Sequence, residues 1–87
     1  MAKVEMFIQQ TCPHCVKARE YLDELKSENP DYGKVDIEMI DELADPRRAD
    51  QYDYWYVPTF FVGGKKLHEG TVTKTDVEDV LKAALAS

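Results

Sequence analysis

The chain has 87 residues, of which 44% are apolar and 32% charged, and its net charge is −6. These values are typical of one soluble globular domain over residues 1–87 and exclude a disordered chain or a membrane protein, which needs apolar runs of about 20 residues. The acidic balance also disfavours nucleic acid, which binds basic surfaces. The first residues do not resemble a signal peptide. We therefore expect a cytoplasmic monomer with no nucleic-acid or membrane partner.

The first half of the chain predicts a strand, a helix and a second strand. Residues 4–9 alternate, with Val4, Met6 and Ile8 on one face and apolar Phe7 on the other, which is typical of a largely buried strand. Apolar residues then recur at helical spacing over 13–27, with Pro13 in the first turn, and the breaker cluster 29–33 ends this helix. Residues 34–41 alternate again. A β-α-β unit of this length predicts a parallel pair of strands with a right-handed crossover.

The second half predicts a short helix, a hairpin and a final helix. Asp45 and Pro46 suit the N-cap and first turn of a helix that ends near Tyr52. Aromatic and β-branched residues predict a third strand over 59–62. A Gly-Gly turn joins this strand to a fourth one at residues 65–68.

The last helix has both a start signal and a continuous apolar stripe. Thr75 and Glu78 fit a capping box, in which each residue satisfies a free backbone N–H group of the other. The stripe consists of Val77, Val80, Leu81, Ala84 and Leu85. The element order is thus β-α-β-α-β-β-α, which predicts an α/β fold with a four-stranded mixed sheet and helices on both faces.

The only two cysteines, Cys12 and Cys15, form a C-x-x-C motif between the first strand and the first helix. A thiol at a helix N-terminus lies near unpaired N–H groups and the positive end of the helix dipole, which favour the reactive thiolate. The second sulfur follows about one turn later, close enough for a short disulfide. In a reducing compartment such a pair is more often catalytic or metal-binding than structural. We expect dithiol–disulfide exchange, with Cys12 as nucleophile and Cys15 as resolving thiol.

The Cys-Pro-His-Cys motif after the first strand, together with Val57-Pro58 before the third, resembles the thioredoxin superfamily, and at this length the chain is most similar to a glutaredoxin. The resemblance implies the thioredoxin/glutaredoxin fold and a cis proline at Pro58 beside the reactive sulfur. It also implies that the Val57 backbone pairs with a bound peptide or with glutathione. The implied substrate-binding residues are Thr11, Tyr56, Val57, Pro58 and Gly70.

The resemblance also implies partners: disulfide-containing proteins or glutathione, and a reductase system based on glutathione reductase or thioredoxin reductase. It implies no tightly bound cofactor, with glutathione as a possible co-substrate. The motif itself is similar to that of bacterial periplasmic disulfide oxidases. By that analogy Pro13 and His14 tune the pKa of Cys12, and the couple is less reducing than that of thioredoxin. The alternative is a solvent-facing His14 with a small effect.

Three functions remain open at this point. Glutathione-using glutaredoxins generally carry Lys where this chain has Gln9, and Thr where it has Tyr56. A small thioredoxin-like reductase of protein disulfides is therefore the alternative to a glutaredoxin acting on glutathione mixed disulfides. A metal or iron–sulfur module is the third possibility. One C-x-x-C supplies only half of a tetrahedral site, so we expect no metal. The aromatic residues 54–56 are expected either to pack against the core or to line a groove beside the sulfurs.

Overall fold

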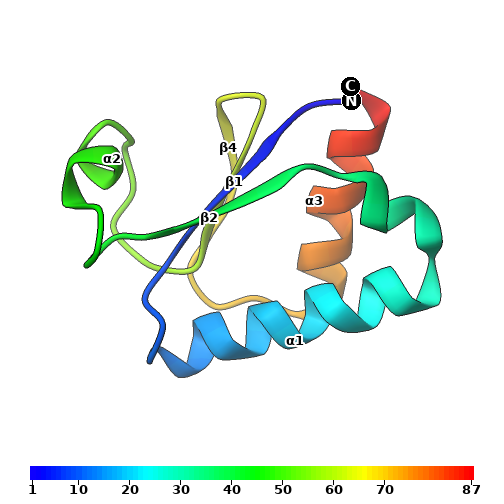
Figure 1. Cartoon of the computed structure of the whole chain (residues 1–87), viewed down its shortest axis with the longest axis horizontal. Helices are drawn as coiled ribbons and strands as arrows, with labels where there is room; N and C mark the ends of the chain where they lie inside the picture. The colour runs from blue at the N-terminus through cyan, green and yellow to red at the C-terminus, as the bar shows by residue number, and fades with distance from the viewer.

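The computed structural model describes residues 1–87 and has a four-stranded sheet at its centre, with the strand order β2-β1-β3-β4 (Figure 1). Strand β1 (Val4–Ile8) runs parallel to β2 (Ile37–Asp41) and antiparallel to β3 (Thr59–Val62). Strand β3 pairs antiparallel with β4 (Lys65–Glu69). The sheet is therefore mixed, and the predicted α/β class and element order are confirmed.

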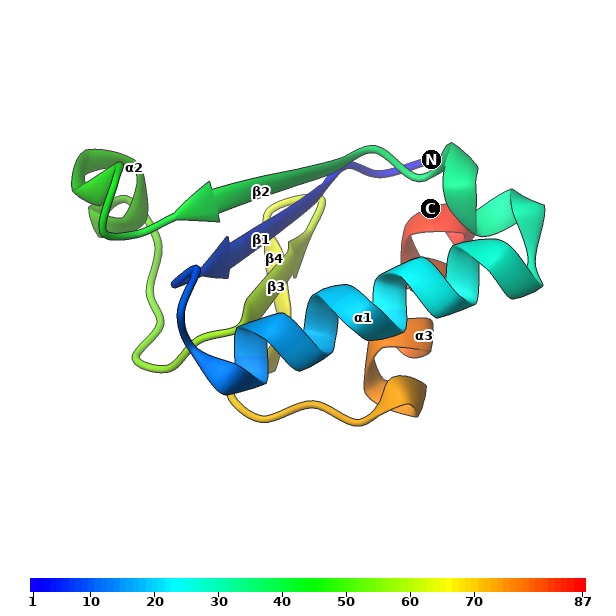
Figure 2. The same ribbon diagram turned by 60° about the horizontal axis from the view of Figure 1, so that its bottom comes forward.

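The two long helices cover one face of this sheet, and a short helix packs at one end of the other face. Figure 2 shows α1 (Pro13–Glu28) and α3 (Lys74–Ala86) on one side, while the short α2 (Pro46–Asp50) follows the carboxyl end of β2. A 3₁₀ helix, η1 (Pro30–Lys34), connects α1 to β2. None of the helices is both long and apolar enough to cross a membrane.

The alternation of β1 divides its side chains between two cores. Val4, Met6 and Ile8 face α1 and α3, where they join a cluster of 16 buried residues. Phe7 points to the other face, where it forms a smaller cluster with Ile40 and Phe61. The period of two in the sequence thus becomes two packed layers, one on each side of the sheet.

The smaller core is closed by aromatic rings from the segment after α2. The Tyr52 and Tyr54 rings lie 4.7 Å and 4.9 Å from the Phe7 ring, measured between centroids. Phe61 meets the Phe7 ring edge-on at 5.7 Å. Aromatic side chains bury a large area per residue, which is how a short segment covers this face without a long helix.

Two predicted boundaries are wrong. The second strand begins at Ile37 and not at residue 34, because residues 30–34 form the 3₁₀ helix η1. The Asn29 side chain accepts a hydrogen bond from the backbone N–H of Asp31, and buried Tyr32 anchors the turn in the core. The short helix α2 ends at Asp50, before the predicted limit near residue 52.

The predicted capping box of the last helix is also wrong. The N-cap is Thr73, whose Oγ1 accepts from the N–H of Asp76 at 3.1 Å, while Asp76 Oδ2 accepts from the N–H of Thr73 at 2.9 Å. Glu78 instead accepts from the Tyr32 hydroxyl at 2.8 Å. Thr73 and Thr75 are each followed three residues later by an acidic residue, so the sequence offers two boxes, and the tertiary contact of Glu78 selects the first.

Candidate active site

Cys12 is the N-cap residue of α1, at the end of the turn that follows β1. Its backbone N–H donates to the Gln9 carbonyl at 3.1 Å, and its carbonyl accepts from the N–H of Val16 at 3.0 Å. Pro13 occupies the first turn, where a missing N–H costs no hydrogen bond. The Cys12 side chain is half-buried, whereas Cys15 lies fully buried in the main core. One helical turn thus carries an accessible sulfur and a covered one.

These positions shift the pKa values of the two thiols in opposite directions. The pKa of Cys12 is lowered, chiefly because the backbone N–H groups of Cys15 and His14 favour its thiolate over the opposing effect of burial. Burial raises the pKa of Cys15 to about 11, although the N–H of Gln9 donates to its Sγ at 3.4 Å. At neutral pH, Cys12 is the better nucleophile and Cys15 is held as a thiol.

A second segment lies at the same edge of the sheet. Because β1 and β3 are antiparallel with Phe7 opposite Thr59, the start of β3 adjoins the end of β1 that leads into Cys12. The Val57–Pro58 peptide bond is cis, as the resemblance implied. The Pro58 carbonyl accepts from the N–H of Gly70 at 2.9 Å, whereas the N–H and C=O of Val57 form no hydrogen bond within the protein. Val57 therefore has a free donor and a free acceptor beside the cysteines.

The loop before Pro58 is held through its backbone. The Glu69 carboxylate, at the end of β4, accepts from the N–H groups of Trp55 and Tyr56 and pairs with Lys66 at 2.8 Å. The Lys66 ammonium and these two N–H groups lower the pKa of Glu69 to about 2. The Trp55 and Tyr56 side chains are 85% and 71% exposed. Of the two arrangements expected for these aromatic residues, packing on the core holds for Tyr54, which stacks on Phe7, whereas the other two rings extend into solvent and form no groove.

Gln9 connects the cysteine motif to a carboxylate that the sequence reasoning missed. Besides its two backbone contacts with the cysteines, Gln9 donates through Nε2 to Glu42 Oε2 at 2.5 Å. The Tyr54 hydroxyl donates to Glu42 Oε1 at 2.7 Å, and burial and this carboxylate raise the pKa of Tyr54. Glu42 follows β2, the parallel neighbour of β1, and its N–H donates to the Ile8 carbonyl at 3.0 Å. The sequence offered one signal for this contact. The carboxyl ends of parallel strands meet at one edge of a sheet, so a residue that follows β2 is expected near the motif that follows β1.

The remaining predicted residues lie around this edge. Thr11 and His14 are exposed in the turn and in the first helical turn. Gly70 has a φ of +89°, and a Cβ built there would lie 3.9 Å from the Tyr56 Cβ. A left-handed backbone of this kind favours glycine, which explains the residue type next to the cis proline. The predicted residues are thus brought together, except that the Tyr56 ring points to solvent.

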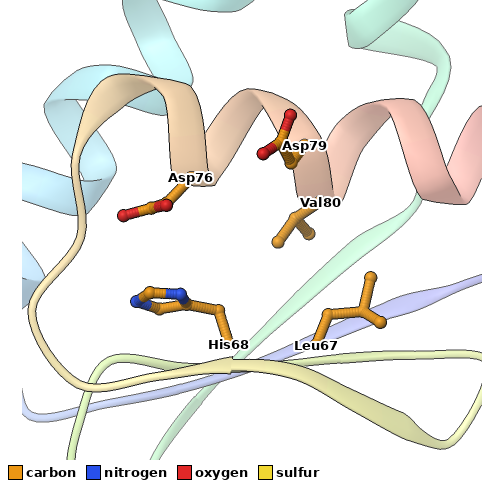
Figure 3. A pocket seen from close by; sticks show the side chains of 5 residues that line it. All are labelled: Leu67, His68, Asp76, Asp79 and Val80. Carbon is orange, nitrogen blue, oxygen red and sulfur yellow. The ribbon is translucent and has the colours of Figure 1, made fainter.

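A pocket of about 260 Å³ lies elsewhere, between β4 and α3 (Figure 3). The side chains of Asp76 and His68 face one another across it, and Asp79 and Val80 lie opposite Leu67. No residue of the cysteine motif or of the cis-proline loop lines this pocket. The cysteines therefore lie on an open surface and not in a cleft.

Comparisons with known proteins agree with this fold. The family model described as Glutaredoxin matches residues 4–67. A protein named Thioredoxin from Methanocaldococcus jannaschii is 32% identical over 83 residues, which is 95% of each chain. Among solved structures, an uncharacterised thioredoxin-like protein from Clostridium perfringens has a TM-score of 0.70 at 28% identity, covering 97% of this chain and 71% of its own. Thioredoxin from Fasciola hepatica has a TM-score of 0.69 at 20% identity, covering 95% and 80%.

Proposed function

The chain belongs to the glutaredoxin family of the thioredoxin superfamily of thiol–disulfide oxidoreductases, and from this premise we propose that it reduces protein disulfides by dithiol exchange through Cys12 and Cys15. The observation that carries the proposal is the asymmetry of the two sulfurs. Cys12 is accessible with a lowered pKa, whereas Cys15 is buried with a pKa raised to about 11. A reductase of this kind needs one thiolate for attack and one thiol kept in reserve.

The exchange proceeds in two substitutions at sulfur. The Cys12 thiolate attacks one sulfur of the substrate disulfide, so that a mixed disulfide forms and the first substrate thiolate leaves and takes a proton. Cys15 then loses its proton to solvent and attacks Cys12 Sγ. The second substrate thiolate leaves, also takes a proton, and the Cys12–Cys15 disulfide remains. Two electrons have passed from the protein to the substrate.

We place the substrate chain along Val57. The N–H and C=O of Val57 have no partner within the protein. An extended segment of the substrate, beside its target cysteine, therefore pairs with both groups as an added strand. Main-chain pairing does not depend on the substrate's side chains, which suits an enzyme that acts on several protein disulfides. His14, exposed in the first turn, and Thr11 border the same approach.

The electron donor we favour is a thioredoxin reductase. Two observations support it: the relative from Methanocaldococcus jannaschii is named Thioredoxin, and Gln9 replaces the Lys typical of glutathione-using members. The Gln9 side chain is neutral and its amide donates to Glu42, so it does not form the ion pair with a carboxylate of glutathione that a Lys would form. Glutathione as co-substrate is the alternative. Delivery of electrons to disulfides needs a reducing compartment, so a cytoplasmic location stays our prediction.

The test offers the oxidised protein two electron sources separately. One is glutathione with glutathione reductase, and the other is NADPH with thioredoxin reductase, while free thiols are counted by alkylation and mass. We expect fast reduction only by the thioredoxin reductase system. Fast reduction by glutathione, with a glutathione adduct trapped on Cys12 in Cys15→Ser, would instead make the protein a glutathione-dependent glutaredoxin.

The control variants separate the roles of the two cysteines. Cys12→Ser is expected to abolish turnover, and Cys15→Ser to stop after the first step with a stable mixed disulfide. If no Cys12–Cys15 disulfide forms under a mild oxidant, dithiol exchange is wrong, and metal binding by the two cysteines becomes the leading function.

A further inference from the structure

We infer that Glu42 is a specificity-determining residue that directs the reaction toward disulfides carrying positive charge beside the reacting sulfurs. The inference rests on the proposed function, because it concerns the substrate that Cys12 attacks. The substrate class is a disulfide with an ammonium or guanidinium group near its sulfurs, as in a cysteine flanked by Lys or Arg.

The first support is the position of the carboxylate. Gln9 contacts all three participants: its carbonyl accepts from Cys12 N–H at 3.1 Å, its N–H donates to Cys15 Sγ at 3.4 Å, and its side chain donates to Glu42. Gln9 thus connects Glu42 to both cysteines in space, although Glu42 is 30 positions from Cys12 in the sequence. Its negative charge also opposes the thiolate of Cys12, in agreement with this proximity.

The second support is that the carboxylate is held in place. The Gln9 amide and the Tyr54 hydroxyl each bind one of its oxygens, and Tyr54 is itself fixed by stacking on Phe7. Both donors are neutral, so no cation neutralises Glu42. A fixed, uncompensated charge acts on an approaching ion at all times, whereas a mobile or paired surface charge has a smaller effect.

One cation, Arg19, also lies near the motif. Arg19, on α1, donates through Nη2 to the Gln10 carbonyl at 3.2 Å, and its charge favours the thiolate of Cys15. The motif therefore has a negative charge, Glu42, and a positive charge, Arg19, in its surroundings. Since the substrate approaches Cys12, Glu42 is expected to dominate the choice of substrate, and Arg19 supplies a variant with the opposite expected sign.

The test measures single-turnover rates of the reduced protein with three small disulfides. Cystamine is cationic, 2-hydroxyethyl disulfide is neutral and glutathione disulfide is anionic. Every rate is divided by that of the neutral probe, which removes any change in the Cys12 pKa. We expect Glu42→Gln to lower the relative rate of cystamine and raise that of glutathione disulfide, each about threefold at low salt. At high salt the changes should shrink because charges are screened.

Three variants complete the test. Asp23→Asn removes the same charge from an exposed position on α1 that has no ion pair, and it should leave the relative rates unchanged. Glu42→Asp keeps the charge and should retain the cation preference even if the shorter side chain loses one hydrogen bond. Arg19→Gln should shift the relative rates in the direction opposite to Glu42→Gln.

The outcomes separate a failure of this inference from a failure of the proposed dithiol exchange. If none of the three disulfides reacts, the proposed dithiol exchange is wrong. If all react but Glu42→Gln leaves the relative rates unchanged, or if Asp23→Asn shifts them equally, the exchange stands and the role of Glu42 is overturned. A shift in Glu42→Gln that is absent in Asp23→Asn and reversed in Arg19→Gln supports the inference.

Discussion

At the scale of single residues, burial gives the two sulfurs of a short motif different chemistry. Cys12 is half-exposed at the helix N-terminus, where backbone N–H groups favour its thiolate, and Cys15 is enclosed by the main core. The free energy of forming a thiolate in apolar surroundings is high, which is why the pKa of Cys15 rises to about 11. The same core that stabilises the fold therefore keeps the second thiol protonated until it is needed.

This difference predicts the alkylation profile of the reduced protein. With iodoacetamide over a range of pH, the rate at Cys12 should rise with a midpoint below the value of about 8.5 for a free cysteine. Cys15 should remain unmodified until the pH approaches about 11. Peptide mass spectrometry assigns each site, and Cys12→Ser should show only the slow reaction. Modification of Cys15 before Cys12 would contradict the assignment of roles.

His14→Tyr should make the redox couple more reducing. We propose that the His14 imidazole stabilises the Cys12 thiolate and hence the reduced form, so its removal favours the disulfide. A tenfold change in the equilibrium corresponds to about 30 mV for two electrons, and we expect a decrease of tens of mV. The measurement is the fraction of oxidised protein in glutathione redox buffers. An unchanged potential would mean that exposed His14 only faces solvent.

At the scale of secondary-structure elements, the N-terminus of α3 shows how a tertiary contact chooses between two local signals. Thr73 and Thr75 both stand three residues before an acidic side chain. Only the first pair forms the box, because the carboxylate of the second pair, Glu78, reaches across to the Tyr32 hydroxyl of η1.

Paired substitutions test this assignment. Thr73→Ala should lower the free energy of unfolding by about 1 kcal/mol, since it removes the cap of α3. Thr75→Ala lies inside the helix and should change stability by only a few tenths of a kcal/mol, because Ala is a good helix former. Urea unfolding followed by circular dichroism compares the two variants. Equal losses, or a larger loss for Thr75→Ala, would show that the helix begins later.

The elements and the site differed in how far they could be predicted. The helices α1 and α3 and the strand β1 follow from periodicity, and Cys12 and Cys15 follow from a local motif with a direct physical consequence. The 3₁₀ helix η1 was missed because residues 29–33 were interpreted only as breakers that end α1. The alternation that includes buried Val35 then placed the start of the second strand too early. Glu42 was missed because its role arises only from the parallel pairing of β1 with β2. The β-α-β pattern predicts that these strands pair, but it does not specify which side chains meet at their ends.

At the scale of the whole molecule, the two faces of the sheet are stabilised differently. The face under α1 and α3 is almost entirely apolar, whereas the α2 face combines a small aromatic core with an ionic network. Arg48 makes a bidentate pair with Glu38 at 2.9 Å and a second pair with Glu5 at 2.6 Å, and Lys3 reaches Glu38 at 2.8 Å. This network joins the N-terminus, α2 and two strands.

The network predicts the response to acid. Arg48 and then Lys3 lower the pKa of Glu38 to about 2, against an unfolded value of 4.5. The stabilisation is therefore complete above about pH 4.5 and is lost as the pH falls through about 2. Glu38→Gln should unfold at a lower urea concentration than the wild type at neutral pH, and the difference should vanish as the pH falls through this window. Asp23→Asn, a change of the same charge on exposed α1, is the control; a pH-independent difference would contradict the linkage.

The way Glu69 holds the loop before the cis proline has a consequence for how this protein can evolve. The contacts run to the backbone N–H groups of Trp55 and Tyr56, so the loop conformation does not depend on which side chains stand there. Those side chains are also the large apolar groups most open to solvent beside the cysteines. We therefore propose that substitutions at these two positions change partner preference while the fold and the cysteine chemistry persist. Substrate recognition and catalysis would then evolve independently, because they depend on different residues.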